Sequence, residues 1–179
     1  MKNNGTTWRD YLVVGLVLFG LFLFFRETKW EQFSSIEGGF SVEFPSKPEI
    51  KRVSGRTSDS RFQNGVLFMA DKGQTSYLVG YADDFNDVVE QSSIEDRLDG
   101  ARDSAIAYLK GEMTSTLETK ISKNGFPGRE IVLQGNGVDC KCRVYIVGKR
   151  RFTLVVTGSN VRFAKDTKRF FDSFELLAN

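Results

Sequence analysis

The chain contains no histidine among its 179 residues. Histidine is the side chain that most readily exchanges protons near neutral pH, and it is the base of serine and cysteine triads. Its absence excludes Ser-His-Asp and Cys-His catalysis and zinc sites built on imidazole. No phosphate-binding glycine loop, GxSxG elbow, CxxC pair or HExxH motif is present, and the carboxylates are too scattered to nominate an acid/base pair. We therefore expect no enzyme, no catalytic residues, no cofactor and no metal ligands.

Cysteine and net charge are also scarce. Two cysteines separated by one residue do not form the disulfide framework of a small secreted protein. A formal net charge of +2 is too small to indicate nucleic acid as a partner. With 40% hydrophobic and 27% charged residues, most of the chain is expected to fold, as one domain with an appendage.

The longest apolar run, Tyr11–Phe25, has 15 residues and no charge. As a helix it would span about 22 Å, which is short of the roughly 30 Å hydrocarbon core of a bilayer. Trp8 and Trp30 are placed to lie at the two interfaces, about 33 Å apart along a helix. Arg9 and Arg26 can extend their charges to the head groups. The run therefore predicts a contact with the lipid bilayer.

Three interpretations of this run remain. A cleaved signal peptide would need small residues after the run, and LFLFFRETKW offers none. A buried helix of a soluble domain would have one apolar face, whereas this run is apolar all round. We favour an uncleaved single-pass anchor over residues 11–27, after a tail of residues 1–10 and before a single domain of residues 28–179. Basic residues are balanced on the two sides of the run, so they do not decide its orientation.

The ribbon Arg129–Thr157 alternates apolar and polar residues with the period of two that is typical of half-buried strands. It predicts three consecutive strands joined by tight turns. Its middle strand places Cys140 and Cys142 on one face, about 6.6 Å apart at Cα, which is near the upper limit for a disulfide. A metal site would need two further ligands, which could only be carboxylates. We favour reduced cysteines in the core, with a disulfide or redox pair and a metal site as alternatives.

The pairing of residues between the strands of the ribbon can be predicted if one face of the ribbon is buried. A two-residue turn at Gly135-Asn136 would pair residue 133 with 138 and place Ile131, Leu133 and Cys140 on the inner face. A three-residue turn at 148–150 would pair residue 146 with 152. The two cysteines would then face the same way as Leu154 and Val156.

Other elements are predicted with less detail. Ser92 and Glu95 fit a capping box, and apolar residues at helical spacing follow until Gly111. Asn160 can cap a second helix whose stripe includes Phe163, Phe170 and Phe171. Further strands are expected over 40–44, 49–54, 61–70, 75–82 and 112–122, with a short closing strand at 175–177. The order predicts an α+β sandwich in which an antiparallel sheet packs against two helices.

Five segments carry a resemblance to a known group of proteins: GFSVEFP at 39–45, LDGARDSAI at 98–106, GFPGREI at 125–131, RVYIVGKRRFTLVV at 143–156 and FFDSFEL at 170–176. They are similar to a widespread set of bacterial membrane-anchored or exported domains whose fold looks like that of the PsbP superfamily. The resemblance covers about 30–177, and its motifs are structural. It implies a domain used mainly for protein binding. Because single-pass anchors commonly tether exported domains, we expect the domain on the extracytoplasmic side of a bacterial inner membrane. The resemblance supplies no functional residue. The lumenal photosystem subunit PsbP binds ions through histidine, and this chain has no histidine.

Two charged groups are the remaining candidates for a site. Basic residues of the last hairpin and the predicted second helix could form one surface for anionic head groups or an acidic partner; they are Lys149, Arg150, Arg151, Arg162, Lys165 and Arg169. Asp83-Asp-Phe-Asn-Asp87 has the composition of a calcium loop but lacks the glycine and distant glutamate of an EF-hand, so a solvated acidic turn is the simpler interpretation.

The function that these observations favour is a membrane-anchored, non-catalytic protein-binding or assembly module. The alternative is a carrier for a small ligand or lipid, with a pocket lined by some of the 16 Phe residues, such as Phe163, Phe170 and Phe171. The sequence leaves the protein partner and the oligomeric state open.

Overall fold

The computed structural model describes residues 29–56, 62–108, 114–135, 137–159, 161 and 164–177. The predicted tail and anchor, with Tyr11–Phe25, lie outside these residues, as do Asn160, Arg162 and Phe163. Within the described ranges, no helix is both long and apolar enough to cross a membrane.

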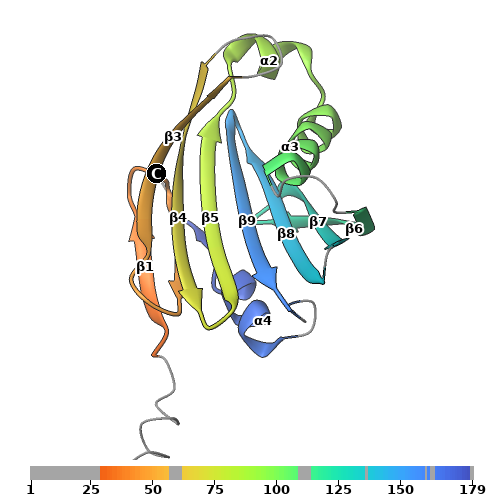
Figure 1. Ribbon diagram of the computed structural model, residues 1–179. Coiled ribbons are helices and arrows are strands. Elements are labelled where there is room, and N and C mark those ends of the chain that lie inside the picture. Colours follow the sequence, from red (N-terminus) through yellow and green to blue (C-terminus); the bar gives the residue numbers. More distant parts are fainter. Residues whose placement is uncertain are drawn as a thin grey trace, which may run out of the picture.

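The described residues form ten strands and three helices (Figure 1). In chain order they are β1 (Glu31–Ser35), β2 (Phe40–Phe44), β3 (Glu49–Arg56), β4 (Phe62–Lys72), β5 (Thr75–Asp83), α2 (Asn86–Gln91), α3 (Ile94–Tyr108), β6 (Thr114–Lys123), β7 (Phe126–Gly135), β8 (Val138–Val147), β9 (Arg150–Gly158), α4 (Lys165–Asp172) and β10 (Glu175–Leu176).

Two antiparallel sheets organise the molecule. The larger has the order β3-β4-β5-β9-β8-β7-β6, and the smaller has the order β1-β2-β10. Helix α3 packs on β7 and β8, whereas the small sheet and α4 cover the opposite face of the large sheet. Helices α2 and α4 lie at opposite ends of the large sheet (Figure 1). The predicted class, α+β with an antiparallel sheet, is confirmed for the described domain.

Two elements were not predicted. Residues 31–35 form β1 and pair with β2, although EQFSS has a single large apolar side chain and no alternating pattern that marks a strand. Residues 86–91 were interpreted as an acidic connection, but they form α2. This helix is short, buries none of its residues and has no side-chain cap, so it leaves no periodic signal in the sequence.

The turn between β8 and β9 contradicts the predicted register. Val147 pairs with Arg150, so the loop has two residues, Gly148 and Lys149, and Tyr145 pairs with Phe152. Gly148 has φ 57°, a left-handed conformation that two-residue hairpin turns require. The prediction of a three-residue loop was wrong because it assumed one buried face, whereas this sheet is covered on both.

The corrected register divides the ribbon between two cores. Leu154 and Val156 face the small sheet, whereas Cys140 and Cys142 face α3. The predicted alignment of the cysteines with Leu154 and Val156 is therefore wrong. Side chains of both parities in β8 and β9 are buried, which is the pattern of central strands covered on two sides.

The turn between β7 and β8 lies one residue further along than predicted. Gly135 pairs with Val138, and Leu133 pairs with Cys140 rather than with Val138. A shift of two residues in register keeps every side chain on its face. Leu133 and Cys140 are therefore buried together, as expected.

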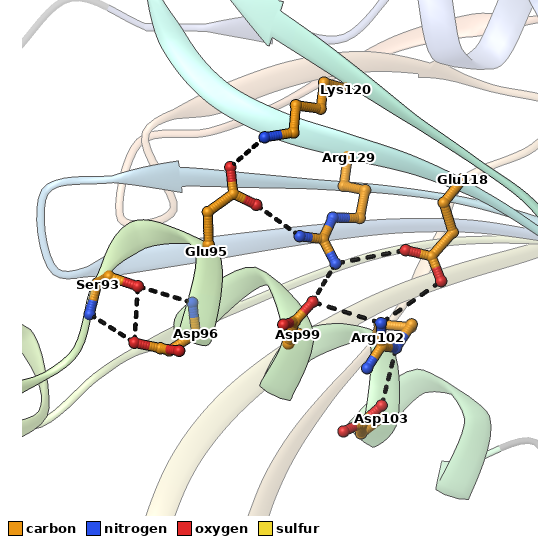
Figure 2. Close-up of polar contacts among 9 residues, drawn as sticks. All are labelled: Ser93, Glu95, Asp96, Asp99, Arg102, Asp103, Glu118, Lys120 and Arg129. Carbon is orange, nitrogen blue, oxygen red and sulfur yellow. Dashed lines mark hydrogen bonds and ion pairs between the residues drawn. The ribbon is translucent and has the colours of Figure 1, made fainter.

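Both predicted helix starts need correction. The capping box of α3 is formed by Ser93, whose hydroxyl accepts from the backbone N–H of Asp96 at 3.1 Å, while Asp96 accepts from the backbone N–H of Ser93 at 3.0 Å (Figure 2). Ser92 and Glu95 were assigned these roles one residue too early. Helix α4 begins at Lys165 and has Ala164 at its N-cap, without a side-chain hydrogen bond.

Candidate functional site

The structure does not bring the predicted basic residues together. Arg150 lies opposite Asp83, at one end of β9. Lys165 and Arg169 lie on α4, at the other end of the sheet, where Asp166 of α4 binds Lys72 at 2.8 Å. Arg162 lies outside the described residues. The hairpin tip and α4 are therefore separate surfaces.

Arg150 holds the large sheet to the small sheet at the hairpin tip. Its Nε and Nη2 donate to the two carboxylate oxygens of Asp83 at 2.7 and 3.0 Å. Its Nη1 donates to the carbonyl oxygens of Glu37 and Gly38, in the turn between β1 and β2, at 2.8 and 3.1 Å. Its guanidinium lies 4.7 Å from the ring centre of Tyr81. This hydrogen bonding to Arg150 lowers the pKa of Asp83, so the pair remains charged across the neutral range.

The neighbours of Arg150 have different roles. Arg151 points to the α3 face of the sheet, where it lies 3.5 Å from Asp84. Asp84 also binds the Nε of Arg97 at 2.9 Å, and both side chains are about 95% buried. Lys149 occupies the turn and is exposed. Of the three predicted basic residues at this tip, only Lys149 presents a free charge to solvent.

Two solvent-open hollows flank Arg150, which lines both together with Asp83. The first has a volume of about 590 Å³ and a mixed polar and apolar lining, whose polar members include Glu37, Arg52, Ser54, Gln63, Asn64 and Tyr81. The second has a volume of about 520 Å³ and more apolar walls, which include Phe126, Val147, Phe152, Leu176 and Leu177. We call these two hollows and the 36–39 turn between them the Arg150 surface.

Tyr81 lines the first hollow, and its hydroxyl oxygen is buried. The residue is 8% exposed, and the Glu37 carboxylate lies near the hydroxyl. Burial and then the nearby charge of Glu37 raise the pKa of Tyr81, so the hydroxyl keeps its proton. Beside it, Glu37 accepts two hydrogen bonds from Arg52 at 3.2 and 3.1 Å. The hollow therefore offers an exposed ion pair, Glu37 with Arg52, to an incoming polar group.

Exposed apolar side chains gather at the same surface. Ile36, in the 36–39 turn, is 90% exposed. Phe126 and Leu177 in the second hollow, and Val53 in the first, are each 37 to 40% exposed. Exposed apolar groups with a polar rim mark interaction sites on protein surfaces. The Arg150 surface is the strongest such grouping among the described residues.

The acidic segment after β5 does not form the solvated turn that was expected. Asp83 is bound by Arg150, and Asp84 is buried with Arg97. Across the described ranges, no group of three or more acidic or cysteine side chains is arranged to hold a metal ion. The segment instead fixes the start of α2 to the large sheet.

The cysteines belong to the α3 core. Cys140 and Cys142 are free and have no exposed surface. Burial raises the pKa of Cys140 to about 12 and that of Cys142 well above its ordinary value. Neither is a reactive thiolate near neutral pH. The prediction of reduced core cysteines is confirmed.

A second charged cluster lies between α3 and the edge of the sheet (Figure 2). Arg129 of β7 donates to Glu95 at 2.7 Å, to Asp99 and to Glu118 at 3.4 Å. The Arg129 side chain is 8% exposed, and its carboxylate partners are considerably more exposed. Every carboxylate of this cluster faces a cation, so the arrangement links helix to sheet and offers no unpaired acid or base.

Two of the three residues named for a Phe-lined pocket lie in the aromatic core. Phe170 and Phe171 are buried and pack against each other, with ring centres 5.5 Å apart. Neither lines the hollows beside Arg150. Phe163, the third predicted member, lies outside the described residues.

Comparison with solved structures places the fold. The chain is similar to CyanoP, the cyanobacterial PsbP from Synechocystis sp. PCC 6803, with a TM-score of 0.58 and 10% sequence identity over 83% of this chain and 93% of that chain. The fold is PsbP-like. A protein of unknown function from Pseudomonas aeruginosa gives a TM-score of 0.38 at 10% identity, over 73% of this chain and 83% of that chain, and carries no argument. No protein-family model and no curated protein matches the chain.

Sequence reasoning located part of this surface and missed the rest. It selected Lys149 and Arg150 for their charge, but Arg150 is a structural link and the exposed apolar residues were not singled out. Phe126 follows the Asn124-Gly125 turn, and Ile36 precedes two glycines. An apolar residue inside a turn is the signal that could have pointed to this surface.

Proposed function

We propose that the PsbP-like domain is a protein-binding or assembly module and that the Arg150 surface is where it binds its partner. The observation that carries the proposal is the gathering of exposed apolar side chains around two hollows, one of which contains the exposed Glu37–Arg52 ion pair. A partner that buries Ile36 and Phe126 removes apolar area from water, and its polar groups can bond to Glu37 or Arg52. Fold likeness alone does not assign function.

The proposal includes a membrane anchor. Tyr11–Phe25 would hold the chain in a bacterial inner membrane as a single-pass protein, with the domain on the extracytoplasmic side. Support comes from the uncharged run and the absence of small residues after it. Resistance to carbonate extraction, together with digestion of the domain by protease added from the extracytoplasmic side, is the expected result. Release by carbonate would contradict the anchor.

Position-specific photocrosslinking tests the binding surface. A photoreactive residue replaces Ile36 in the full chain in intact membranes, and a matched control replaces Leu117, which is 57% exposed on the edge strand β6. We expect the Ile36 probe to capture one protein that the Leu117 probe does not. Equal capture at both positions, or capture of lipid alone, would overturn the proposed surface.

A further inference from the structure

The described chain is fixed to the domain at its first residues, beside α4. Trp30 is 8% exposed and packs edge-on against Tyr77, with ring centres 5.3 Å apart. The guanidinium of Arg169 and the ammonium of Lys72 lie 5.1 and 5.8 Å from the Trp30 ring centre. The sequence suggested a free Trp30 ring at a membrane interface, but the ring belongs to the aromatic core. The chain therefore leaves the domain at a defined point.

The distance from this point to the apolar run is short. Four residues, 26–29, lie between Phe25, the last residue of the run, and Trp30, so five Cα–Cα steps join the two. Since an extended residue spans at most about 3.6 Å, Trp30 lies no more than roughly 18 Å from the end of the run. Trp30 packs on Tyr77, which pairs with Val156, and Arg150 lies six residues back along β9, so at about 3.3 Å per residue the Arg150 surface is roughly 20 Å further along the sheet. The tether is thus shorter than the domain.

We propose that the α4 end of the domain rests on the head-group layer of the membrane that holds the N-terminal segment, and that the Arg150 surface faces away from it. This inference depends on the anchor in the proposed function. A tether attached at Trp30 keeps α4 near the lipid while the opposite end remains open to a partner. The partner would then bind about one domain length from the bilayer.

The exposed side of α4 suits head groups rather than hydrocarbon. Thr167, Phe170 and Phe171 are buried, and the outward residues are charged. Lys168 pairs with Asp172, while Lys165 is exposed. Charges of both signs are matched by zwitterionic head groups, so the contact does not require an anionic lipid. Phosphatidylcholine is therefore an adequate probe.

The test uses the full chain reconstituted into phosphatidylcholine vesicles that carry a quencher on some head groups. A fluorophore is attached through a maleimide to Lys165→Cys or, as the matched control, to Lys149→Cys. Both lysines are exposed, and neither side chain makes an ion pair or hydrogen bond in the described structure. Cys140 and Cys142 are buried and should not react, so one label per chain also reports that each variant is folded.

We expect quenching of the Lys165→Cys probe and unchanged emission from the Lys149→Cys probe. Equal quenching, or quenching only at residue 149, would overturn the orientation while leaving the anchor intact. A chain that fails to float with the vesicles would overturn the anchor and this inference with it. Crosslinking at Ile36 is scored separately, so loss of the binding surface is distinguishable from loss of the orientation.

Discussion

The two faces of the seven-stranded sheet are covered in different ways. The face toward the small sheet is covered by aromatic side chains. The ring centre of Phe40, for example, lies 5.2 Å from that of Phe68 and 5.9 Å from that of Phe174. The face toward α3 has a smaller core of aliphatic side chains and two cysteines, and ion pairs to Arg129 join helix to sheet. Burial of apolar area scales with stability, whereas exposed ion pairs contribute little. The aromatic face should therefore dominate the stability of the domain.

The two faces of the sheet also differ in whether they lead to a surface that a partner could bind. The aromatic core reaches the Arg150 surface through Tyr81 and Phe152, which line its hollows. The α3 side reaches solvent through paired charges that leave little for a partner to bind. Substitutions should consequently divide into large losses of stability in the aromatic core, intermediate losses at Arg129, and small losses at the Arg150 surface.

The largest effect is expected at the aromatic core. Phe40 is fully buried, so Phe40→Ala should reduce the free energy of unfolding by about 3–5 kcal/mol. Phe126→Ala is the matched control, and at 37% exposure it should change the free energy by no more than about 1 kcal/mol. Urea denaturation of the two variants measures the difference. Similar losses at both positions would contradict the account of the core.

An intermediate effect is expected on the α3 face. Removing Arg129 leaves Glu95, Asp99 and Glu118 without their shared cation, and Arg129→Ala should cost about 1–3 kcal/mol. Arg52→Ala, at an exposed bidentate pair with Glu37, should cost much less because solvent screens that pair. Chemical denaturation at low salt compares the two. Equal costs would show that the burial of Arg129 has no energetic consequence.

The same cluster predicts a dependence of stability on pH. Hydrogen bonds from Lys120 and Arg129 lower the pKa of Glu95, and the bond from Arg129 lowers that of Asp99, below ordinary values of 4.5 and 3.8. A folded pKa below the unfolded value gives stability that is present above the unfolded pKa and is lost as pH falls through the folded pKa. The denaturant concentration at the midpoint of unfolding should therefore decrease as the pH is lowered below about 4.5. Arg129→Gln should flatten part of that fall, and an unchanged slope would rule out this contribution.

Alkylation of the two cysteines tests the α3 core without any substitution. Because burial raises the pKa of both thiols and excludes solvent, an impermeant maleimide should not modify native Cys140 or Cys142 at pH 8. Both should react in urea, and mass spectrometry counts the added groups. Rapid labelling of the native protein would show that the α3 face opens, or that the cysteines are not in its core.

The elements that could be predicted from the sequence are those whose pattern of apolar and polar side chains fits only one kind of secondary structure. Alternation in residues 138–146 predicts the strand, and the stripe through Leu98 and Ala101 predicts α3. The register at Gly148 could not be predicted, because a sheet covered on both faces makes odd and even positions apolar alike. Charge at Arg150 was visible in the sequence. Its bidentate bond to Asp83, 67 residues away, depends on β5 pairing with β9, which no local pattern specifies.

The most direct test of the binding surface is the effect of Arg52→Gln on crosslinking from Ile36. The substitution removes an exposed cation that lines the first hollow, so the free energy of unfolding should change little. If Arg52 bonds to the bound partner, crosslink yield should fall severalfold in the same membranes. A stable variant with unchanged yield would contradict the claim that a partner occupies the hollow beside Arg150.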